Sequence, residues 1–354
     1  MAEVERRYRR HALVRFFAIA IGLGLLLALA LVALTLGSAD IGPVEALRAL
    51  GTIVGVGSDE YADPEAARKA LIVLELRLPR VLMAMLAGAA LAASGTVLQG
   101  LLRNVLVAPS IVGINSAAAF GASAVIVLGV SVAGFGAIAV VGAALVAALG
   151  CAGIVFSLSW FHQMRPATVI LVGVALSFLF NAFMEILQFI ATEEQIAEIV
   201  FWTFGSFNNA TNREVLILLI MLALGLPWLL FKVGSLNAVA FGGDEVARGL
   251  GVNILRLRLI CGVIAVAFAA VVVSFSGIIG FVGLVGPHIA RFSIGADHRY
   301  LLPFSMVCGA FLLLGADTIG RNLFPVLIPV GIVVALLGVP LFLHLILSHR
   351  GEYF

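Results

Sequence analysis

Long apolar stretches, separated by charged residues, prolines and glycine clusters, run through most of the chain. A helix needs about 20 mostly apolar residues to cross the hydrocarbon core of a bilayer. The pattern therefore predicts ten transmembrane helices, at residues 16–36, 81–101, 110–130, 136–160, 168–190, 214–231, 258–274, 276–292, 302–318 and 330–347. The boundary between the seventh and eighth helices depends on a short polar break at Ser274–Gly277.

The start of the chain resembles a signal peptide, because five arginines in residues 6–15 precede the first apolar run. That run, residues 16–36, is longer than the roughly 7–15 apolar residues of a signal peptide, and no good cleavage site follows it. We therefore expect residues 1–15 to form a cytoplasmic tail and residues 16–36 to remain as the first transmembrane helix.

Composition supports lipid as the solvent for this chain. Hydrophobic residues make up 62% of the 354 positions, charged residues only 11%, and the mean hydropathy is +1.18. Soluble domains have about 45–50% apolar and about 25% charged residues. The net charge of +2 gives no indication of a nucleic-acid partner. Each cysteine (Cys151, Cys261 and Cys308) lies in an apolar run, which is typical of a small buried hydrophobic residue.

The charges outside the apolar runs are unevenly distributed between the two sides. The side that carries the N-terminus holds 14 of the 21 Lys and Arg residues, and the opposite side holds 7. Because Lys and Arg accumulate in cytoplasmic loops, both termini are expected in the cytoplasm. The expected fold is an all-α polytopic membrane protein with one transmembrane domain, residues 16–348, and short tails at 1–15 and 349–354.

Two polar segments are long enough to have structure of their own. In the outer loop, residues 37–80, a short helix is expected from Pro64. In the cytoplasmic segment, residues 232–257, Gly243 or Asp244 can cap a short helix with Glu245 in its first turn, and Gly249 or Gly251 can end it.

Glycine and alanine are frequent within the predicted transmembrane helices. The runs Gly88–Ala93 and Gly142–Ala148 predict close helix packing, because small residues let helix backbones approach one another in lipid.

Ionisable residues within the membrane mark ion or proton pathways in many transporters. Here the predicted helices hold few of them: Glu185 lies near the outer end of its helix, where a role at the membrane interface is expected. Asn115 and Asn181 could line a path or could bond to neighbouring helices. This scarcity favours an energy source outside the chain.

The sequence gives no indication of an enzyme. It contains no Walker A motif, no Gly-x-Ser-x-Gly and no His-Glu-x-x-His, and its histidines have no zinc-site spacing. No catalytic residue, metal ligand or cofactor of this chain is expected. The six histidines all fall at or near predicted cytoplasmic ends: His11, His162, His288, His298, His344 and His349.

Three separated blocks resemble the FecCD-type permeases, which are the membrane subunits of bacterial ABC importers for iron-siderophores, haem and cobalamin. The blocks are LRLPRVLMAMLAGAALAASGTVLQGLLRNVLVAPSIVGINSAAAFG from Leu76, GLVGPHIARFSIGADHRYLLP from Gly283 and IPVGIVVALLGVPLFLHL from Ile328. The resemblance implies a ten-helix permease subunit in the bacterial cytoplasmic (inner) membrane. ATP and Mg would then bind to a separate ATPase subunit.

The resemblance also implies a docking site on the outer face. Outward-facing arginines of the related cobalamin permease receive acidic residues of a binding protein, and the matching positions are Arg77, Arg80 and Arg321. Arginine suits this role because it stays charged and grips carboxylates with two parallel hydrogen bonds. The simpler alternative is that Arg77 and Arg80 anchor the second helix at the lipid headgroups.

On the cytoplasmic face the resemblance implies a gate and a coupling segment. The gate matches Asn104 and Leu106 after the second helix, and Pro166, Ala167 and Thr168 before the fifth. Val105 replaces the proline usual in the family, which leaves this loop less rigid. The ATPase-coupling positions match residues of segment 232–257, with a solvated connector as the alternative: Gly243, Glu245, Ala247, Leu250 and Gly251.

The expected assembly contains a second permease copy or close paralogue, two ATP-binding cassette subunits, a periplasmic or lipid-anchored binding protein, and membrane lipid. The expected cargo is an iron chelate, a siderophore complex or haem. Cobalamin or another metal chelate, and zinc or manganese importers of similar topology, stay open. An ion-coupled secondary transporter and a membrane enzyme acting on lipid or haem are the alternatives from other classes.

Overall fold

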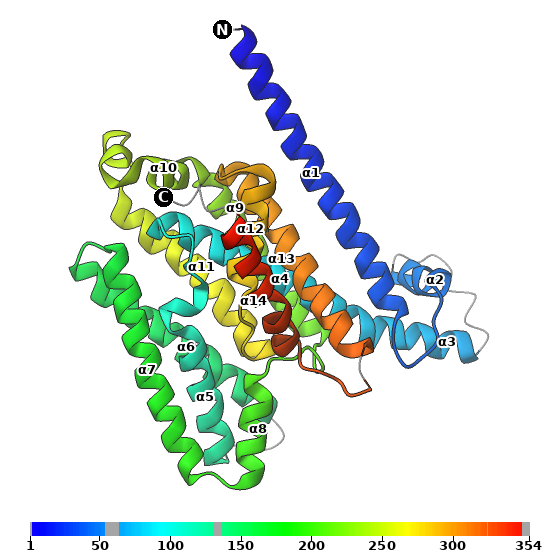
Figure 1. Cartoon of the computed structure of the whole chain (residues 1–354). Coiled ribbons are helices and arrows are strands. Elements are labelled where there is room, and N and C mark those ends of the chain that lie inside the picture. The colour runs from blue at the N-terminus through cyan, green and yellow to red at the C-terminus, as the bar shows by residue number, and fades with distance from the viewer. Residues whose placement is uncertain (1, 54–63, 130–135, 324, 349–354) are drawn as a thin grey trace.

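A computed structural model describes residues 2–53, 64–129, 136–323 and 325–348, and within these ranges the regular structure is entirely helical (Figure 1). The helices are α1 (Ala2–Thr35), α2 (Pro43–Ile53), α3 (Pro64–Leu71), α4 (Leu78–Leu102), α5 (Ile114–Leu128), α6 (Gly136–Phe161), α7 (Pro166–Ile190), α8 (Glu193–Thr203), α9 (Asn212–Phe231), α10 (Val233–Gly249), α11 (Ile254–Ser276), α12 (Val282–Ile294), α13 (His298–Asn322) and α14 (Val330–Ser348).

Each of the ten predicted transmembrane segments corresponds to a helix. Seven stretches of the described chain are long and apolar enough to cross a membrane: Ala12–Thr35, Pro64–Leu102, Gly136–Phe161, Pro166–Ile190, Asn212–Phe231, Ile254–Ser276 and His298–Asn322. Helix α5 and the stretch Val330–His344 of α14 are shorter apolar helices, and α12 is the tenth. The predicted all-α polytopic fold is therefore confirmed.

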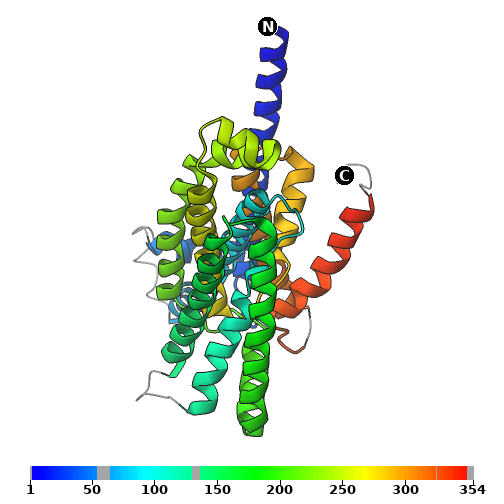
Figure 2. The same ribbon diagram turned by 90° about the vertical axis from the view of Figure 1, so that its left-hand side faces the viewer.

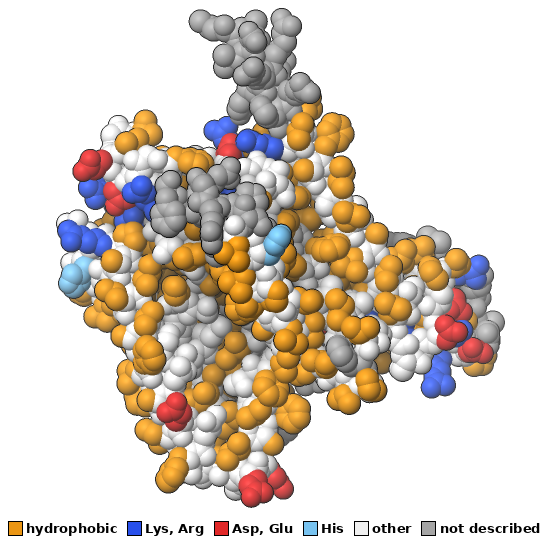
Figure 3. All heavy atoms as spheres, viewed as in Figure 1, with side chains coloured by type: hydrophobic (Ala, Val, Ile, Leu, Met, Phe, Trp, Pro, Cys, Tyr) orange, Lys and Arg blue, Asp and Glu red, His pale blue; other side chains and the backbone are white. Residues whose placement is uncertain are grey.

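The bundle has one end that carries α10 and an opposite end that carries α8. The start of α1 and the end of α14 both lie toward the end with α10 (Figures 1 and 2). Basic side chains are prominent around α10 and acidic side chains at the opposite end (Figure 3). This arrangement agrees with the even number of crossings and with the uneven distribution of charge along the sequence.

The structure adds detail at the start of the chain and in the segment 37–80. Within the expected tail, residues 1–15, the described residues are helical, because α1 runs from Ala2 to Thr35; the stretch apolar enough to cross a membrane begins at Ala12. The helix expected from Pro64 is present as α3, but a π-helical turn, Ile72–Arg77, joins it to α4 without a break. The pattern of apolar runs also misses α2 and α8, which are short and partly polar.

The polar break predicted at Ser274–Gly277 is confirmed. Helix α11 ends at Ser276, and Gly277 has a φ of 72°, a backbone conformation that glycine adopts without strain. Residues 277–281 are not helical, and α12 begins at Val282.

Helices α4, α11, α12 and α13 form the buried centre, whereas α1, α6, α7 and α9 expose mainly apolar side chains. Close contact at the centre depends on glycine. A Cβ atom at Gly88 would overlap the carbonyl oxygen of Gly309, and one at Gly95 would overlap that of Gly283. Small residues on α4 therefore set its distance from α12 and α13.

The two predicted small-residue runs differ in their packing. Gly88–Ala93 lies in the tight contact just described. In Gly142–Ala148, the buried residues are Ala144 and Ala148, but a Cβ at Gly142 would meet nothing within 4 Å. The run still makes a close helix contact, because a Cβ added at Gly121 of α5 would overlap the carbonyl oxygen of Ala143 and lie 2.8 Å from the Cβ of Ala147.

Replacing Gly88 with alanine tests the α4–α13 contact. We expect Gly88→Ala to destabilise the protein by about 1–3 kcal/mol, because overpacking forces the two backbones apart. Gly150→Ala in α6 is the control, because a Cβ at Gly150 meets nothing within 4 Å. Thermal unfolding of the purified variants in detergent checks this; an equal Tm for both would contradict the packing argument.

Candidate functional site

The three arginines predicted to dock a binding protein line one cavity of about 500 Å³ at the end of the bundle opposite α10. Arg77 ends the π-helical turn before α4, Arg80 lies in the first turn of α4, and Arg321 lies in the last turn of α13. Glu75, Asn208 and Asn322 also line the cavity. Asp317 pairs with Arg80, so three cations face two carboxylates, and the remaining positive charge favours an acidic partner.

Arg77 is the most buried of the three, with 5% of its surface exposed. Its Nη1 atom donates to the carbonyl oxygens of Leu34 (2.7 Å) and Thr35 (2.8 Å), and its Nη2 atom donates to that of Ala39 (2.6 Å). These carbonyls belong to the end of α1 and the loop after it. Arg77 therefore holds the end of α1 against the start of α4. These hydrogen bonds occupy both of its terminal nitrogens.

Arg80 and Arg321 combine internal contacts with access to the cavity. Arg80 donates Nε and Nη2 to the carboxylate of Asp317, with an Nη2–Oδ1 distance of 2.8 Å, and donates Nη1 to Asn208. Arg321 donates Nη2 to the carbonyl oxygen of Ala33 (2.7 Å). Glu185, the carboxylate that the sequence places within a predicted helix, is exposed on α7. The buried carboxylate is instead Asp317, which is only 3% exposed.

The two short helices α2 and α3 are joined by a further ion pair. The carboxylate of Glu45 in α2 accepts from the backbone N–H of Gly42 (2.7 Å) and from Lys69 Nζ of α3 (3.0 Å). These two hydrogen bonds hold the pKa of Glu45 below its usual value, and the one from Gly42 has the larger effect. The pair joins α2 to α3 at the surface.

The predicted gate residues lie in two turns, one after α4 and one before α7. After α4, Arg103 adopts a left-handed conformation (φ 50°), and the Oδ1 atom of Asn104 accepts from the backbone N–H of Leu106. Leu106 is 54% exposed. Pro166 begins α7, where its fixed φ suits the first helical position, with Ala167 and Thr168 in the same turn. Val105 lies between Asn104 and Leu106.

The predicted coupling positions lie at the end of α10. The helix is broken at Gly243, whose φ of 74° and ψ of −177° separate residues 233–242 from a final short turn. The expected start near Gly243 or Asp244 is therefore correct, but the preceding helical residues were not expected. Ala247 and Gly243 are buried, whereas Glu245, Leu250 and Gly251 are exposed and open to a partner.

Polar side chains fasten α10 at both of its ends. At the first, Asn237 donates to Asp297 Oδ1 (2.7 Å) and its Oδ1 accepts from the backbone N–H of His298 (2.9 Å). At the second, Asp244 forms an ion pair with Arg258 of α11, with a shortest distance of 2.8 Å. The pattern of apolar runs assigns no role to Arg258. A charged residue at the edge of an apolar run nevertheless indicates that the charge has a partner.

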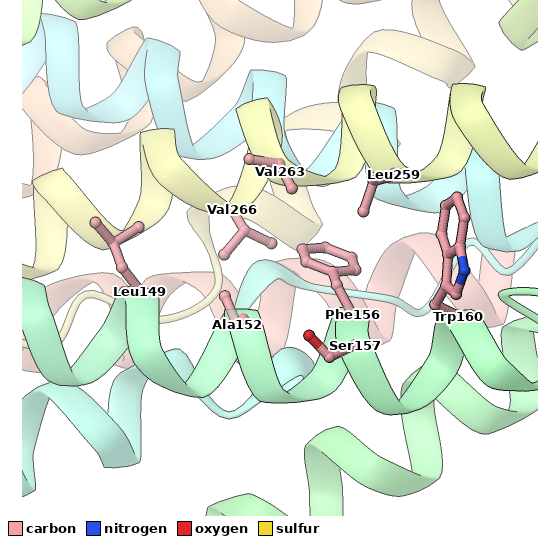
Figure 4. A pocket seen from close by; sticks show the side chains of 9 residues that line it. Leu149, Ala152, Phe156, Ser157, Trp160, Leu259, Val263 and Val266 are labelled. Carbon is pink, nitrogen blue, oxygen red and sulfur yellow. The ribbon is translucent and has the colours of Figure 1, made fainter.

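A groove between α6 and α11 is almost entirely apolar. Its labelled side chains point toward one another from the two helices (Figure 4), and Ser157 is the polar residue among them. It encloses about 530 Å³ and suits hydrocarbon better than a charged chelate. The possible path residues Asn115 and Asn181 lie elsewhere, half-buried on α5 and α7. Among the described residues, no group of three or more His, Cys, Asp or Glu could hold a metal ion.

Comparison with known proteins gives a consistent result. The hemin transport system permease of Yersinia pestis is 39% identical over 286 residues, which cover 79% of this chain and 84% of that protein. The molybdate import permease of Haemophilus influenzae is 38% identical, with 77% and 79% covered. The Fe(3+)-citrate import permease YfmE of Bacillus subtilis is 35% identical, with 83% and 89% covered.

A solved structure, described as an inward-facing conformation of a metal-chelate type ABC transporter, superposes with a TM-score of 0.80 at 34% identity. The match covers 93% of this chain and 98% of that one. The model of the FecCD transport family matches residues 25–348. The chain therefore belongs to the FecCD transport family and is the multi-pass permease subunit of an ABC importer.

Proposed function

We propose that this permease carries an iron chelate, a siderophore complex or haem, across a bacterial cytoplasmic membrane. The observation that supports this best is the arginine-lined cavity at the outer end, which lies on the same bundle as the exposed coupling positions at the end of α10. The relatives named for hemin and Fe(3+)-citrate favour iron. Cobalamin or another metal-containing cargo is the second candidate, because a molybdate permease is also similar.

The mechanism requires partners. Two permease copies enclose the path, two ATP-binding cassette subunits bind beneath them, and a loaded binding protein docks on the outer face. The exposed apolar face of α7 offers a surface for the second copy. ATP binding favours one arrangement of the gates over the other, and about 5.5 kcal/mol of differential binding is enough to move an equilibrium from 1:99 to 99:1.

Within the proposed assembly the coupling positions divide into two groups. Glu245, Leu250 and Gly251 are exposed and would contact the ATPase, whereas Gly243 and Ala247 are buried and would shape the segment from within. At the outer face, Arg80 and Arg321 would receive carboxylates of the binding protein. Arg77 would support them by fixing the end of α1.

Uptake into proteoliposomes tests the proposed function. The permease, its ATPase and its binding protein, loaded with labelled haem, ferric siderophore or cobalamin, are expected to accumulate an iron chelate only when ATP is supplied to the ATPase side. Replacing ATP with ADP is the control. Accumulation of cobalamin alone would contradict the iron assignment. Accumulation driven by an ion gradient without ATP would contradict the ABC mechanism.

Substitution of the outer arginines tests the docking role. We expect Arg321→Gln to weaken binding-protein affinity about fivefold at low salt, the effect of losing a solvent-accessible ion pair of about 1 kcal/mol. Arg77→Gln is expected to lower Tm and leave the affinity of the folded protein unchanged. Arg213→Gln, an exposed outer arginine outside the cavity, is the control. Equal affinity for Arg321→Gln and Arg213→Gln would contradict docking at this cavity.

A further inference from the structure

Arg258 lies where three separate parts of the cytoplasmic end meet. Its Nη1 and Nη2 atoms donate to both carboxylate oxygens of Asp244, at 3.0 and 2.8 Å. Its Nε atom donates to the carbonyl oxygen of Leu101 (3.1 Å) in the last turn of α4. Nη1 also donates to the carbonyl oxygen of Met164 (3.3 Å), in the turn between α6 and α7. One guanidinium thus contacts the coupling segment and the backbone beside both gate turns.

The two carbonyl contacts place Arg258 directly beside the gate residues. Leu101 precedes Asn104 by three positions, and Met164 precedes Pro166 by two. The last carbonyls of a helix have no partner within it, so Arg258 supplies a donor at the end of α4. Any displacement of this guanidinium changes the hydrogen bonding of both gate turns together.

The contact with the coupling segment is equally specific. Asp244 directly follows the break at Gly243, and its carboxylate is held by two parallel hydrogen bonds, a geometry that fixes orientation as well as distance. A second contact supports it: a Cβ atom at Gly243 would lie 2.9 Å from Nη1 of Arg103, the residue that precedes Asn104. The broken end of α10 and the turn after α4 are therefore packed together.

Burial distinguishes this pair from an ordinary surface ion pair. The Arg258 side chain is 3% exposed, whereas that of Asp244 is 32% exposed. Breaking a pair with one buried partner leaves an uncompensated charge inside the protein, so the contact persists unless the whole cluster rearranges. A segment moved by an ATPase would then carry Arg258 with it or would have to break the cluster.

We propose that Arg258 is a positioning residue that transmits movement of the coupling segment to the two gate turns through Asp244. This inference rests on the proposed function, because it requires an ATPase that moves α10. The planar guanidinium has its donors in a fixed arrangement, so its contacts set both the orientation and the distance of its partners. A lysine ammonium at the same place would contact fewer oxygens and hold no fixed orientation.

The test uses the complete importer in proteoliposomes and measures both ATP hydrolysis and uptake. Asp244→Asn removes the charge and one acceptor oxygen, and Asp244→Glu keeps the carboxylate. We expect uptake per ATP hydrolysed to fall about tenfold in Asp244→Asn, a size usual for coupling between sites, and to recover in part in Asp244→Glu. Arg258→Gln is expected to uncouple in the same way.

Arg256→Gln is the matched control, because Arg256 is an exposed arginine two positions away on the same helix. The amount of assembled complex and its Tm are measured for every variant. An Asp244→Asn complex that keeps the wild-type ratio of uptake to hydrolysis would overturn the proposal. So would a parallel loss of both activities in proportion to the assembled complex, because that result indicates a purely structural role.

A second readout does not depend on which chelate is carried. Leu106, 54% exposed in the gate turn, is replaced with cysteine in a chain without Cys151, Cys261 and Cys308. ATP is expected to change the maleimide labelling rate of this cysteine in the otherwise unchanged chain, but not in Asp244→Asn. If no chelate is taken up by the wild-type complex, the proposed function fails, whereas this comparison still decides the role of Arg258.

Discussion

The free-energy cost of burying an arginine among apolar helices shapes both ends of this protein. A charged group in such surroundings must be paired and hydrogen-bonded, or it destabilises the fold by several kcal/mol. Arg77 meets this requirement with three backbone carbonyls, Arg80 with Asp317, and Arg258 with Asp244 and two carbonyls. In each case at least one partner belongs to a helix other than the arginine's own, so satisfying the charge also fixes how those two helices meet.

Between these two polar ends, contact depends on the absence of side chains. Lipid provides little hydrophobic drive for helix association, so close van der Waals contact carries much of it. Gly88, Gly95 and Gly309 let α4 approach α12 and α13 until the backbones touch. Because the centre is closely packed, it resists continuous deformation and moves as a unit or changes between discrete arrangements.

The apolar pattern predicts the positions of ten helices, and seven stretches of the described chain are long and apolar enough to cross a bilayer. It fails where other forces decide. Helices α2 and α8 are short and contain both apolar and polar residues, and the π-helical turn Ile72–Arg77 has no hydropathy signal of its own. Gly142 belongs to a small-residue run yet faces open space, because which side of a helix meets a neighbour depends on tertiary packing.

The candidate site shows the same division. Family resemblance selects Arg77, Arg80 and Arg321, and the structure brings all three to one cavity, which spacing along the chain could not predict for residues about 240 positions apart. The resemblance does not show that Arg77 is the most buried of the three arginines. Arg77 is buried because the end of α1 packs over its guanidinium, and only the structure shows this contact. Asp317 and Arg258 carry a weak signal, a charge at the edge of an apolar run, which becomes specific only once its partner is known.

Helix α4 links these two polar ends physically. Arg77 and Arg80 stand at its start, and the Leu101 carbonyl bound by Arg258 stands in its last turn. Nearly every residue between Gly88 and Leu102 is buried, and its glycines are in contact with α12 and α13. A rigid, tightly packed helix with a polar attachment at each end is suited to carry a shift from one face to the other without bending. A displacement at either attachment would therefore move α4 as a unit together with the helices packed against it.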